Sequence, residues 1–184
     1  MRMKTLLPAL CFAAAILPLS AQETEAGIQG GLIFPQSDLR SAVNGRTGFT
    51  LGVHGGIDLQ GGNELRPRID YTRIDYTRID GGSFSLSSLN STTTVQAVGV
   101  GIDYLRYLEG RRRGSYAVAG IELNWWESQY RFRGSDRETS PSLMVGVGHR
   151  FNSSWSMEFN LDWGQFRSYV GTASDIKGGV FYRF

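Results

Sequence analysis

The sequence predicts an all-β protein, an eight-stranded antiparallel transmembrane β-barrel. Apolar and polar residues alternate through most of the chain, which is the period of a strand with two unlike faces. After residue 22, no apolar stretch is long enough to form a transmembrane helix. Aromatic residues stand at both ends of the clearest apolar face, as in strands that face lipid between two interfacial girdles.

The clearest strand is WSMEFNLDW, residues 155–163, in which polar residues alternate with a fully apolar set. A half-buried strand of a soluble sheet also alternates in this way. The tryptophan at each end of the apolar face favours lipid, because spanning strands run about 9 to 11 residues between aromatic girdles. The apolar face consists of Trp155, Met157, Phe159, Leu161 and Trp163.

The same alternation identifies eight strands, at 26–36, 47–59, 64–77, 92–107, 114–130, 140–151, 154–167 and 174–184. An even number of strands lets an antiparallel sheet close, and closure is required in lipid because an open edge leaves backbone groups unpaired. The other seven apolar faces are, in chain order, Ile28, Leu32, Phe34; Phe49, Leu51, Val53, Ile57, Leu59; Leu65, Ile69, Tyr71; Val98, Val100, Ile102, Tyr104; Ala117, Ala119, Ile121, Leu123, Trp125; Leu143, Val145, Val147, Phe151; and Ile176, Gly178, Val180, Tyr182, Phe184.

The connections between these strands alternate in length. Residues 60–63, 108–113 and 152–153 are short, whereas 37–46, 78–91 and 131–139 are longer and polar. This asymmetry is typical of transmembrane barrels, which have short periplasmic turns and long external loops. The last external connection, 168–173, is an exception because it is short.

The chain ends in KGGVFYRF, with a polar residue followed by Gly179 and by aromatic residues at the third-last and last positions. This ending resembles the C-terminal signal of bacterial outer-membrane barrels, which the barrel-assembly machinery reads. With it, residues 22–184 resemble the OmpA/OmpX-like family, the outer membrane protein beta-barrel domain. The resemblance implies a small barrel in the outer membrane of a Gram-negative cell, and the signal residues would be Lys177, Gly179, Tyr182 and Phe184.

The first residues read as a secretory signal peptide. A basic MRMK precedes an apolar run, and LSA at 19–21 is a small-residue cleavage site. Cleavage after Ala21 would leave residues 22–184 as one barrel domain and would remove Cys11, so no disulfide is available to the mature chain. It would also remove Arg2 and Lys4, leaving 17 basic and 17 acidic residues, and this balance does not suggest a nucleic-acid partner.

The polar faces predict a charged barrel interior. An eight-stranded barrel is only wide enough to be filled by its own side chains. Because the inward charges have mixed signs, we expect ion pairs and water that leave no continuous pore, with inward glycines such as Gly52 and Gly99 making room. A narrow wet channel is the alternative. The predicted interior charges are Asp58, Arg66, Arg68, Asp70, Asp103, Glu122, Arg150, Glu158, Asp162, Lys177 and Arg183.

The outward aromatic residues predict the two interfacial girdles. Trp125 and Trp126 are adjacent and must face opposite ways, so one should join the outer girdle while the other covers the lumen or begins the loop. The predicted girdle residues are Phe34, Phe49, Tyr71, Tyr104, Trp125, Phe151, Trp155, Trp163, Tyr182 and Phe184.

A five-residue repeat, RIDYTRIDYTRID at 68–80, interrupts the third strand pattern. An odd repeat sends equivalent side chains to opposite faces in successive copies. Arg73 and Asp75 would then face outward, and they are costly in hydrocarbon. We therefore expect the second and third copies to stand above the membrane as a strand extension and loop. A β-bulge that resets the parity is the alternative.

The sequence does not predict an enzyme or a metal site. His54 and Asp58 share a face but lie about 13 Å apart at the normal strand rise, too far for a base and its orienting group. His149 falls on the outward face near the periplasmic end. With two separated histidines and no mature cysteine, neither a metal nor another cofactor is expected.

Arginines in the connections carry weaker signals. RRR at 111–113 is expected to be a solvated periplasmic turn. Arg131, Arg133 and Arg137 lie in the third external loop, where bidentate pairing with lipopolysaccharide phosphates is chemically apt.

The expected function is a non-enzymatic, monomeric outer-membrane barrel that serves envelope structure or surface interaction through its external loops. A narrow channel or a carrier of small hydrophobic solutes is the alternative, and a lipid A-modifying enzyme is a remote one. The expected partners are outer-membrane lipid, lipopolysaccharide and, during biogenesis, the barrel-assembly machinery.

Overall fold

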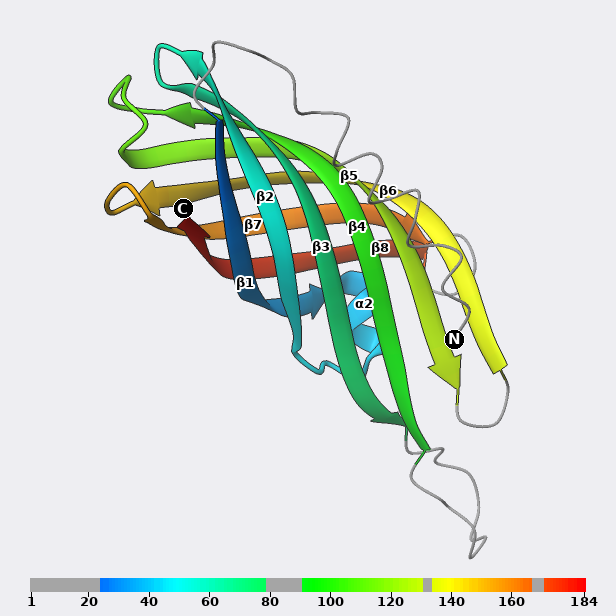
Figure 1. Ribbon diagram of the computed structural model, residues 1–184. Helices are drawn as coiled ribbons and strands as arrows, with labels where there is room; N and C mark the ends of the chain where they lie inside the picture. The colour runs from blue at the N-terminus through cyan, green and yellow to red at the C-terminus, as the bar shows by residue number, and fades with distance from the viewer. Residues whose placement is uncertain (1–23, 79–90, 131–133, 167–170) are drawn as a thin grey trace, which may run out of the picture.

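The computed structural model describes residues 24–78, 91–130, 134–166 and 171–184, which form a closed antiparallel barrel of eight strands and one short helix (Figure 1). The signal peptide predicted for residues 1–21 lies outside these residues. In chain order the elements are β1 Thr24–Gln36, α2 Ser37–Ala42, β2 Gly48–Gln60, β3 Asn63–Arg78, β4 Ser91–Tyr107, β5 Gly114–Tyr130, β6 Gly134–Arg150, β7 Trp155–Phe166 and β8 Gly171–Arg183.

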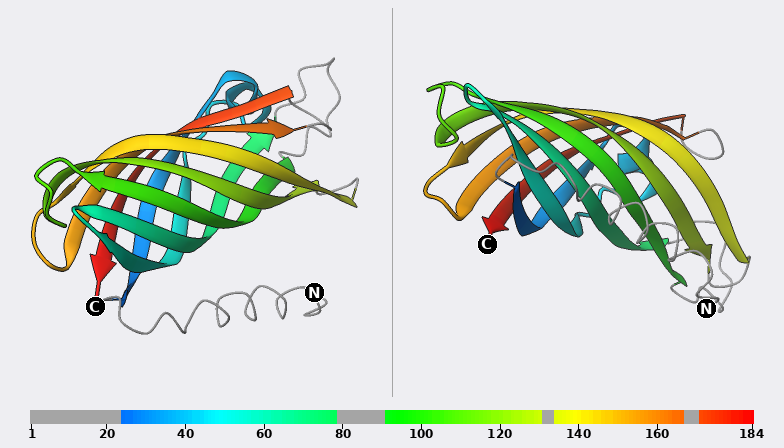
Figure 2. Two further views of the ribbon diagram at one scale, coloured as in Figure 1. Left: turned by 90° about the horizontal axis from the view of Figure 1, so that it is seen from above. Right: turned by 45° about the horizontal axis from the view of Figure 1, so that its top comes forward.

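Each strand pairs with its neighbours in sequence, and β8 pairs with β1 from Gly27↔Arg183 to Gln36↔Ser174. This last pairing leaves the sheet without a seam and confirms the predicted fold. Closure satisfies the backbone groups that an open sheet would expose to hydrocarbon. Figure 2 shows the strands strongly tilted around the barrel axis, as closure of so few strands requires.

The two ends of the barrel differ. At the short-turn end lie the connections 61–62, 108–113 and 151–154, together with the start of β1 and the end of the chain. At the long-loop end, the connection after β1 contains the unpredicted helix α2, which packs against β8 and β1. None of the described helices is long and apolar enough to cross a bilayer.

Four strands continue past the rest at the long-loop end (Figure 1). β3 stays paired with β4 as far as Arg78↔Ser91, although its pairing with β2 ends at Phe49↔Arg73. β6 begins at Gly134, six residues earlier than predicted, because its polar first residues pair with β5 while its register with β7 starts only at Ser142↔Gly164.

The RIDYT repeat runs straight through β3 as far as Arg78, and residues 79–80 lie outside the described residues. The register of β3 with β4 is unbroken from Asn63 to Arg78, so no bulge resets the parity there. The irregularity in this part of the sheet is instead in β2, between Asp58 and Gln60. Arg73 and Asp75 therefore share the outer face, where they form an exposed ion pair of 3.0 Å.

The two surfaces of the sheet have the predicted characters. Outward residues are apolar and exposed, such as Leu143, Val147 and Phe159. Inward residues are largely polar or charged, and most of the buried polar side chains of the protein line the lumen. The core of this protein is thus a largely polar and charged lumen that also contains two smaller apolar clusters.

An arginine on the outer face should destabilise the barrel according to its depth. Ile121 is exposed and lies opposite Ile102 and Leu143, so Ile121→Arg places a charge in the middle of the apolar band. We expect a loss of about 2–4 kcal/mol in the free energy of unfolding, measured by urea titration in liposomes. Ser115→Arg, on the same face of β5 near the short-turn end, should cost about 0–1 kcal/mol. Equal losses in the two variants would contradict the predicted depth of the strand.

Candidate functional site

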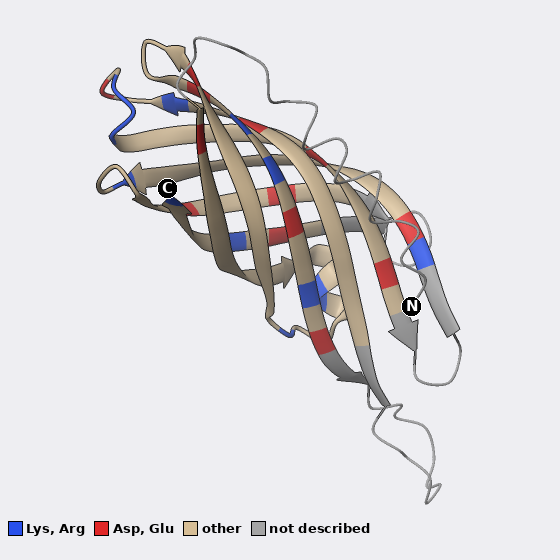
Figure 3. Cartoon of the chain, in the orientation of Figure 1, with Lys and Arg blue, Asp and Glu red and all other residues tan. Residues whose placement is uncertain are grey.

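The lumen is lined by three zones of ion pairs, named lower, middle and upper from the short-turn end to the long-loop end. Acidic and basic residues are interspersed along the length of the barrel (Figure 3). The lower zone contains Glu25, Asp58, Glu64, Arg112, Arg150 and Arg183; the middle zone contains Arg66, Arg68, Asp103 and Glu158; the upper zone contains Asp70, Glu122, Asp162, Asp175 and Lys177.

In the lower zone, two carboxylates gather the arginines. Arg183 lies 2.9 Å from Glu64 and 3.1 Å from Glu25. Arg112 reaches in from the 108–113 turn to contact the same two carboxylates, at 3.2 Å and 2.6 Å. Arg150 lies 3.3 Å from Glu25. The network therefore ties β1, β3, β6 and β8 to a turn and closes the lower end of the lumen.

In the middle zone, Arg66 bridges opposite walls of the barrel. Its guanidinium lies 2.9 Å from Asp103 of β4 and also pairs with Glu158 of β7. The same group lies 4.5 Å from the centre of the Phe181 ring, a cation–π contact. Tyr116 donates a hydrogen bond of 2.7 Å to Glu158, so the ion pair has further polar partners, as a buried pair requires.

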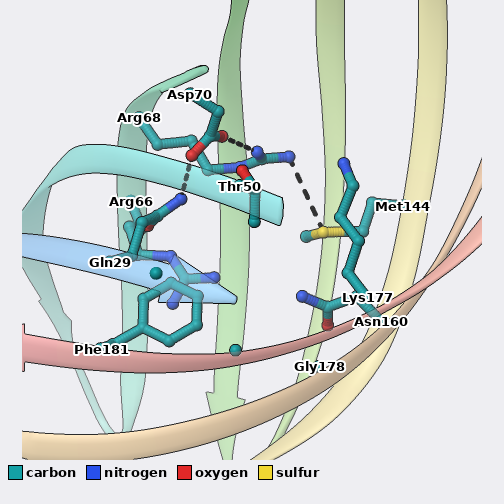
Figure 4. A pocket seen from close by; sticks show the side chains of 12 residues that line it. Gln29, Thr50, Arg66, Arg68, Asp70, Met144, Asn160, Lys177, Gly178 and Phe181 are labelled. Atoms are coloured by element: carbon teal, nitrogen blue, oxygen red, sulfur yellow. Dashed lines mark hydrogen bonds and ion pairs between the residues drawn. The ribbon is translucent and has the colours of Figure 1, made fainter. Parts of the chain in front are cut away.

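Arg68 connects the middle zone to the upper zone. It lies 3.0 Å from both Asp103 and Glu122 and also pairs with Asp70. Figure 4 shows the Asp70 carboxylate between Arg68 and Gln29, with Lys177 on the opposite side of the cavity. A single guanidinium thus serves three carboxylates.

The upper zone has fewer cations. Lys177 of β8 lies 2.8 Å from Asp162 of β7 and 3.8 Å from Glu122 of β5. Asp175 is buried on the same face of β8, directly opposite Asp162 in the register. Asn124 donates a hydrogen bond of 3.0 Å to Ser142 beside this cluster.

Above the ion pairs, α2 brings an apolar cluster into the mouth of the barrel. Leu39 and Val43, in and just after the helix, are buried against Ile74 and Val95 from the inner faces of β3 and β4. Trp126 packs against the same cluster. The lumen is therefore closed at this end by a hydrophobic cap formed by Leu39, Val43, Ile74, Val95 and Trp126.

The lumen is densely filled, and inward glycines make that filling possible. A Cβ at Gly99 would collide with the carboxylate of Glu122, and one at Gly52 with that of Asp70. Among the described residues, one cavity of about 30 Å³ lies beside Arg68 and one of about 20 Å³ lies beside Asp162, and Lys177 lines both. Each has room for about one or two water molecules.

The structure places all eleven predicted interior charges on the inner face, although Asp58 is a partly exposed residue of the lower rim. It adds Glu25, Glu64 and Asp175, which the sequence analysis did not single out although extending the alternation to the strand ends would have found them. The alternation could not have identified Arg112, because this residue lies in a turn and not in a strand. The prediction that RRR is a solvated turn is wrong for Arg112, because Glu25 and Glu64 draw its side chain inward.

The ten predicted girdle residues lie on the outer face in two belts. The long-loop belt consists of Phe34, Phe49, Tyr71, Trp125 and Trp163; the short-turn belt consists of Tyr104, Phe151, Trp155, Tyr182 and Phe184. Rings contact each other within a belt in tilted arrangements, with centroids 4.7 Å apart for Trp155 and Tyr182. Of the four predicted signal residues, Lys177 and Gly179 face the lumen, and Tyr182 and Phe184 face outward.

Neither histidine belongs to a described catalytic arrangement. His54 is buried in the lumen against Phe181, with 5.5 Å between ring centroids, and the described residues leave both of its ring nitrogens without a hydrogen bond. Asp58 instead lies 3.9 Å from Arg112. On the outer face, His149 Nδ1 lies 3.0 Å from Ser115 Oγ, and no carboxylate is described in hydrogen bond with that ring.

The family model of the "Outer membrane protein beta-barrel domain" matches residues 7–184. No curated protein matches the chain. Among solved structures, Neisserial surface protein A is similar at 14% identity and a TM-score of 0.58, covering 88% of this chain and 97% of its own. Ail of Yersinia pestis, in complex with the heparin analogue sucrose octasulfate, has 12% identity, a TM-score of 0.56 and coverages of 88% and 99%.

The N-terminal β-barrel domain of OprF from Pseudomonas aeruginosa is also similar, at 12% identity and a TM-score of 0.51, covering 89% of this chain and 99% of that domain. At these identities the likeness concerns the fold. It agrees with the strand order and closure described above.

Loss of Arg66 should be far more damaging than loss of an exposed arginine on the same strand. In Arg66→Met, Glu158 remains buried without a cation, which typically costs about 3–5 kcal/mol of the free energy of unfolding. Arg73→Met removes only the exposed pair with Asp75 and should leave stability nearly unchanged. Urea titration of both variants in liposomes measures the difference, and similar losses would show that the middle zone is not a stabilising centre.

Proposed function

The chain belongs to the outer membrane protein beta-barrel domain family, and we propose that it acts as a non-enzymatic monomer serving envelope structure or surface interaction. The molecule is a small outer-membrane β-barrel with a buried, salt-bridged interior. The observation that carries the proposal is the contrast between this filled lumen and the four strands that continue beyond the barrel wall.

The filled interior favours a structural role for the barrel over a role in transport. Arg66 and Arg68 span the lumen between opposite walls, and the hydrophobic cap lies above them. A solute or hydrophobic ligand would have to break several buried charge pairs, each costly to separate. This makes the channel and carrier alternatives less favourable than a barrel whose activity lies at its surface.

The projecting part supports interaction at the surface. Beyond the barrel wall, β3 from Ile74 to Arg78 is paired with β4 on one side, and its other edge pairs with no strand among the described residues. Unpaired strand edges are templates for adding an extended segment of another protein. We therefore infer that a partner binds at this edge and at the external loops.

We infer the orientation and biogenesis from membership of the family. The short-turn end would face the periplasm, the N-terminal 21 residues would be a cleaved signal peptide, and the barrel-assembly machinery would read the chain end. Lipopolysaccharide would surround the long-loop end, where Arg137 is an exposed arginine that lies 3.2 Å from Glu127. Arg131 and Arg133 lie outside the described residues.

A lipid A-modifying activity is the remote alternative. The Ser115–His149 pair lies on the outer face and belongs to the short-turn end, whereas lipid A would lie at the other end. It also has no described carboxylate to orient the ring, which catalytic serine–histidine pairs usually require. A change in lipid A acyl chains upon expression would revive this alternative.

Trimming the projecting strands should abolish surface binding without affecting the folded barrel. A variant in which a two-residue turn replaces residues 128–136 removes the tip of the β5–β6 hairpin and leaves the lumen untouched. We expect unchanged heat-dependent gel mobility and a loss of binding to host-cell or bacterial surfaces, measured with liposomes that carry the barrel. As a control, Arg66→Met alters the lumen and should retain binding wherever it folds. Equal surface binding by the trimmed and parent barrels would contradict the proposal.

Conductance should distinguish a filled barrel from a channel. In planar bilayers we expect no steady unitary current steps from the parent protein, because the ion-pair network and the hydrophobic cap close the lumen. Steady steps at membrane potentials that leave the barrel folded would instead support the channel alternative.

A further inference from the structure

Charges are unevenly balanced along the lumen. The lower zone has three arginines for three carboxylates, but the middle and upper zones together have three cations for six carboxylates. The excess lies in the upper zone, where Lys177 is the one cation among the described residues. Buried carboxylates without compensation are strongly unfavourable, so a bound cation or a proton would stabilise the barrel there. The upper carboxylates are Asp70, Glu122, Asp162 and Asp175.

The geometry around Asp175 shows where that charge is missing. Asp175 is 7% exposed, and its Oδ1 atom has no hydrogen-bond partner. It lies directly opposite Asp162 in the β7–β8 register, where like charges repel. Lys177 approaches Asp162 to 2.8 Å and Glu122 to 3.8 Å, and no ion pair between it and Asp175 is found within 4.0 Å.

A cavity of about 20 Å³ adjoins this carboxylate. Asp162, Asp175 and Lys177 line it together with the polar side chains of Ser140, Ser142 and Asn124. The volume accommodates one water-sized particle. Carboxylate, hydroxyl and amide oxygens are the ligands that a hard cation prefers. Lys177 is the one cationic side chain among the described residues that line the cavity, and it is already paired with Asp162 at 2.8 Å.

We propose that the upper cavity binds one hard divalent cation of the calcium or magnesium class. Asp175 and Asp162 would provide the charged ligands, and the neutral oxygens of Ser140, Ser142 and Asn124 would complete the shell. No group of three or more His, Cys, Asp or Glu side chains with metal-binding geometry occurs in the described ranges, so the neutral oxygens are needed. The charge excess favours a divalent over a monovalent ion.

Such an ion would join four strands just below the hydrophobic cap. Its ligands come from β5, β6, β7 and β8, and it would neutralise the repulsion between the two opposed aspartates. A ligand that binds only the folded state stabilises it by mass action. The site would therefore make the stability of the barrel depend on divalent cations without any role in catalysis.

The test uses the purified barrel, refolded in detergent without lipopolysaccharide at pH 8. After treatment with EDTA, CaCl₂ or MgCl₂ is added, and choline chloride provides matched ionic strength. We expect the divalent ion to raise the thermal midpoint, followed by gel mobility, by several degrees. Asp175→Asn should abolish this shift and, without added ion, should be at least as stable as the parent. Asp75→Asn, which removes an exposed carboxylate on the outer face, should keep the shift.

A second measurement reads binding directly. Trp126 lines the cavity, so Tb³⁺ bound there should show tryptophan-sensitised emission that Asp175→Asn eliminates and Trp126→Phe reduces. The proposal is overturned if the midpoint responds to neither divalent ion, or if Asp175→Asn retains the response or the emission. A midpoint that rises only upon acidification would also overturn it, because a proton would then balance the charge.

Discussion

In hydrocarbon every backbone N–H and C=O group must find its partner within the protein, and here the eighth strand meets that demand by pairing with the first. Once the sheet is closed, each strand has one face toward lipid and one toward the lumen. The outer face then has to be apolar, with aromatic rings near the two interfaces. The inner face is narrow and cannot be left empty, so its own side chains must fill it.

Filling that lumen with charge creates the second constraint. Arg66 and Arg68 each serve carboxylates from several strands, so a small number of guanidinium groups fastens opposite walls together. Glycines on the inner face accept the long side chains from neighbouring strands. In the lower zone the numbers of arginines and carboxylates are equal. Beside Asp175 the carboxylates outnumber the cations, and an additional positive charge is most favourable there.

The long-loop end lies beyond the apolar band, so its outward residues need not be apolar. The part of the RIDYT repeat after Tyr71, the polar start of β6 and the short helix α2 are all there. A repeat of odd length is tolerable where neither face of the strand meets lipid. The same freedom lets strands project, with an open edge on β3, and this makes that end the natural place for contacts with other molecules.

The sequence by itself determined the eight strands and, within the spans it assigned, which charged residues face inward, because alternation with a period of two is a local property that a one-residue error would reverse. It predicted that one of Trp125 and Trp126 joins the girdle and that the other covers the lumen or begins the loop. It contained no sign of α2, since six residues are too few for a helical period. Only the tertiary structure decided which charges meet. Arg112 pairs with Glu25 across 87 positions, and Asp175 is left facing Asp162, because partners across a lumen depend on strand tilt and register, which no local pattern records.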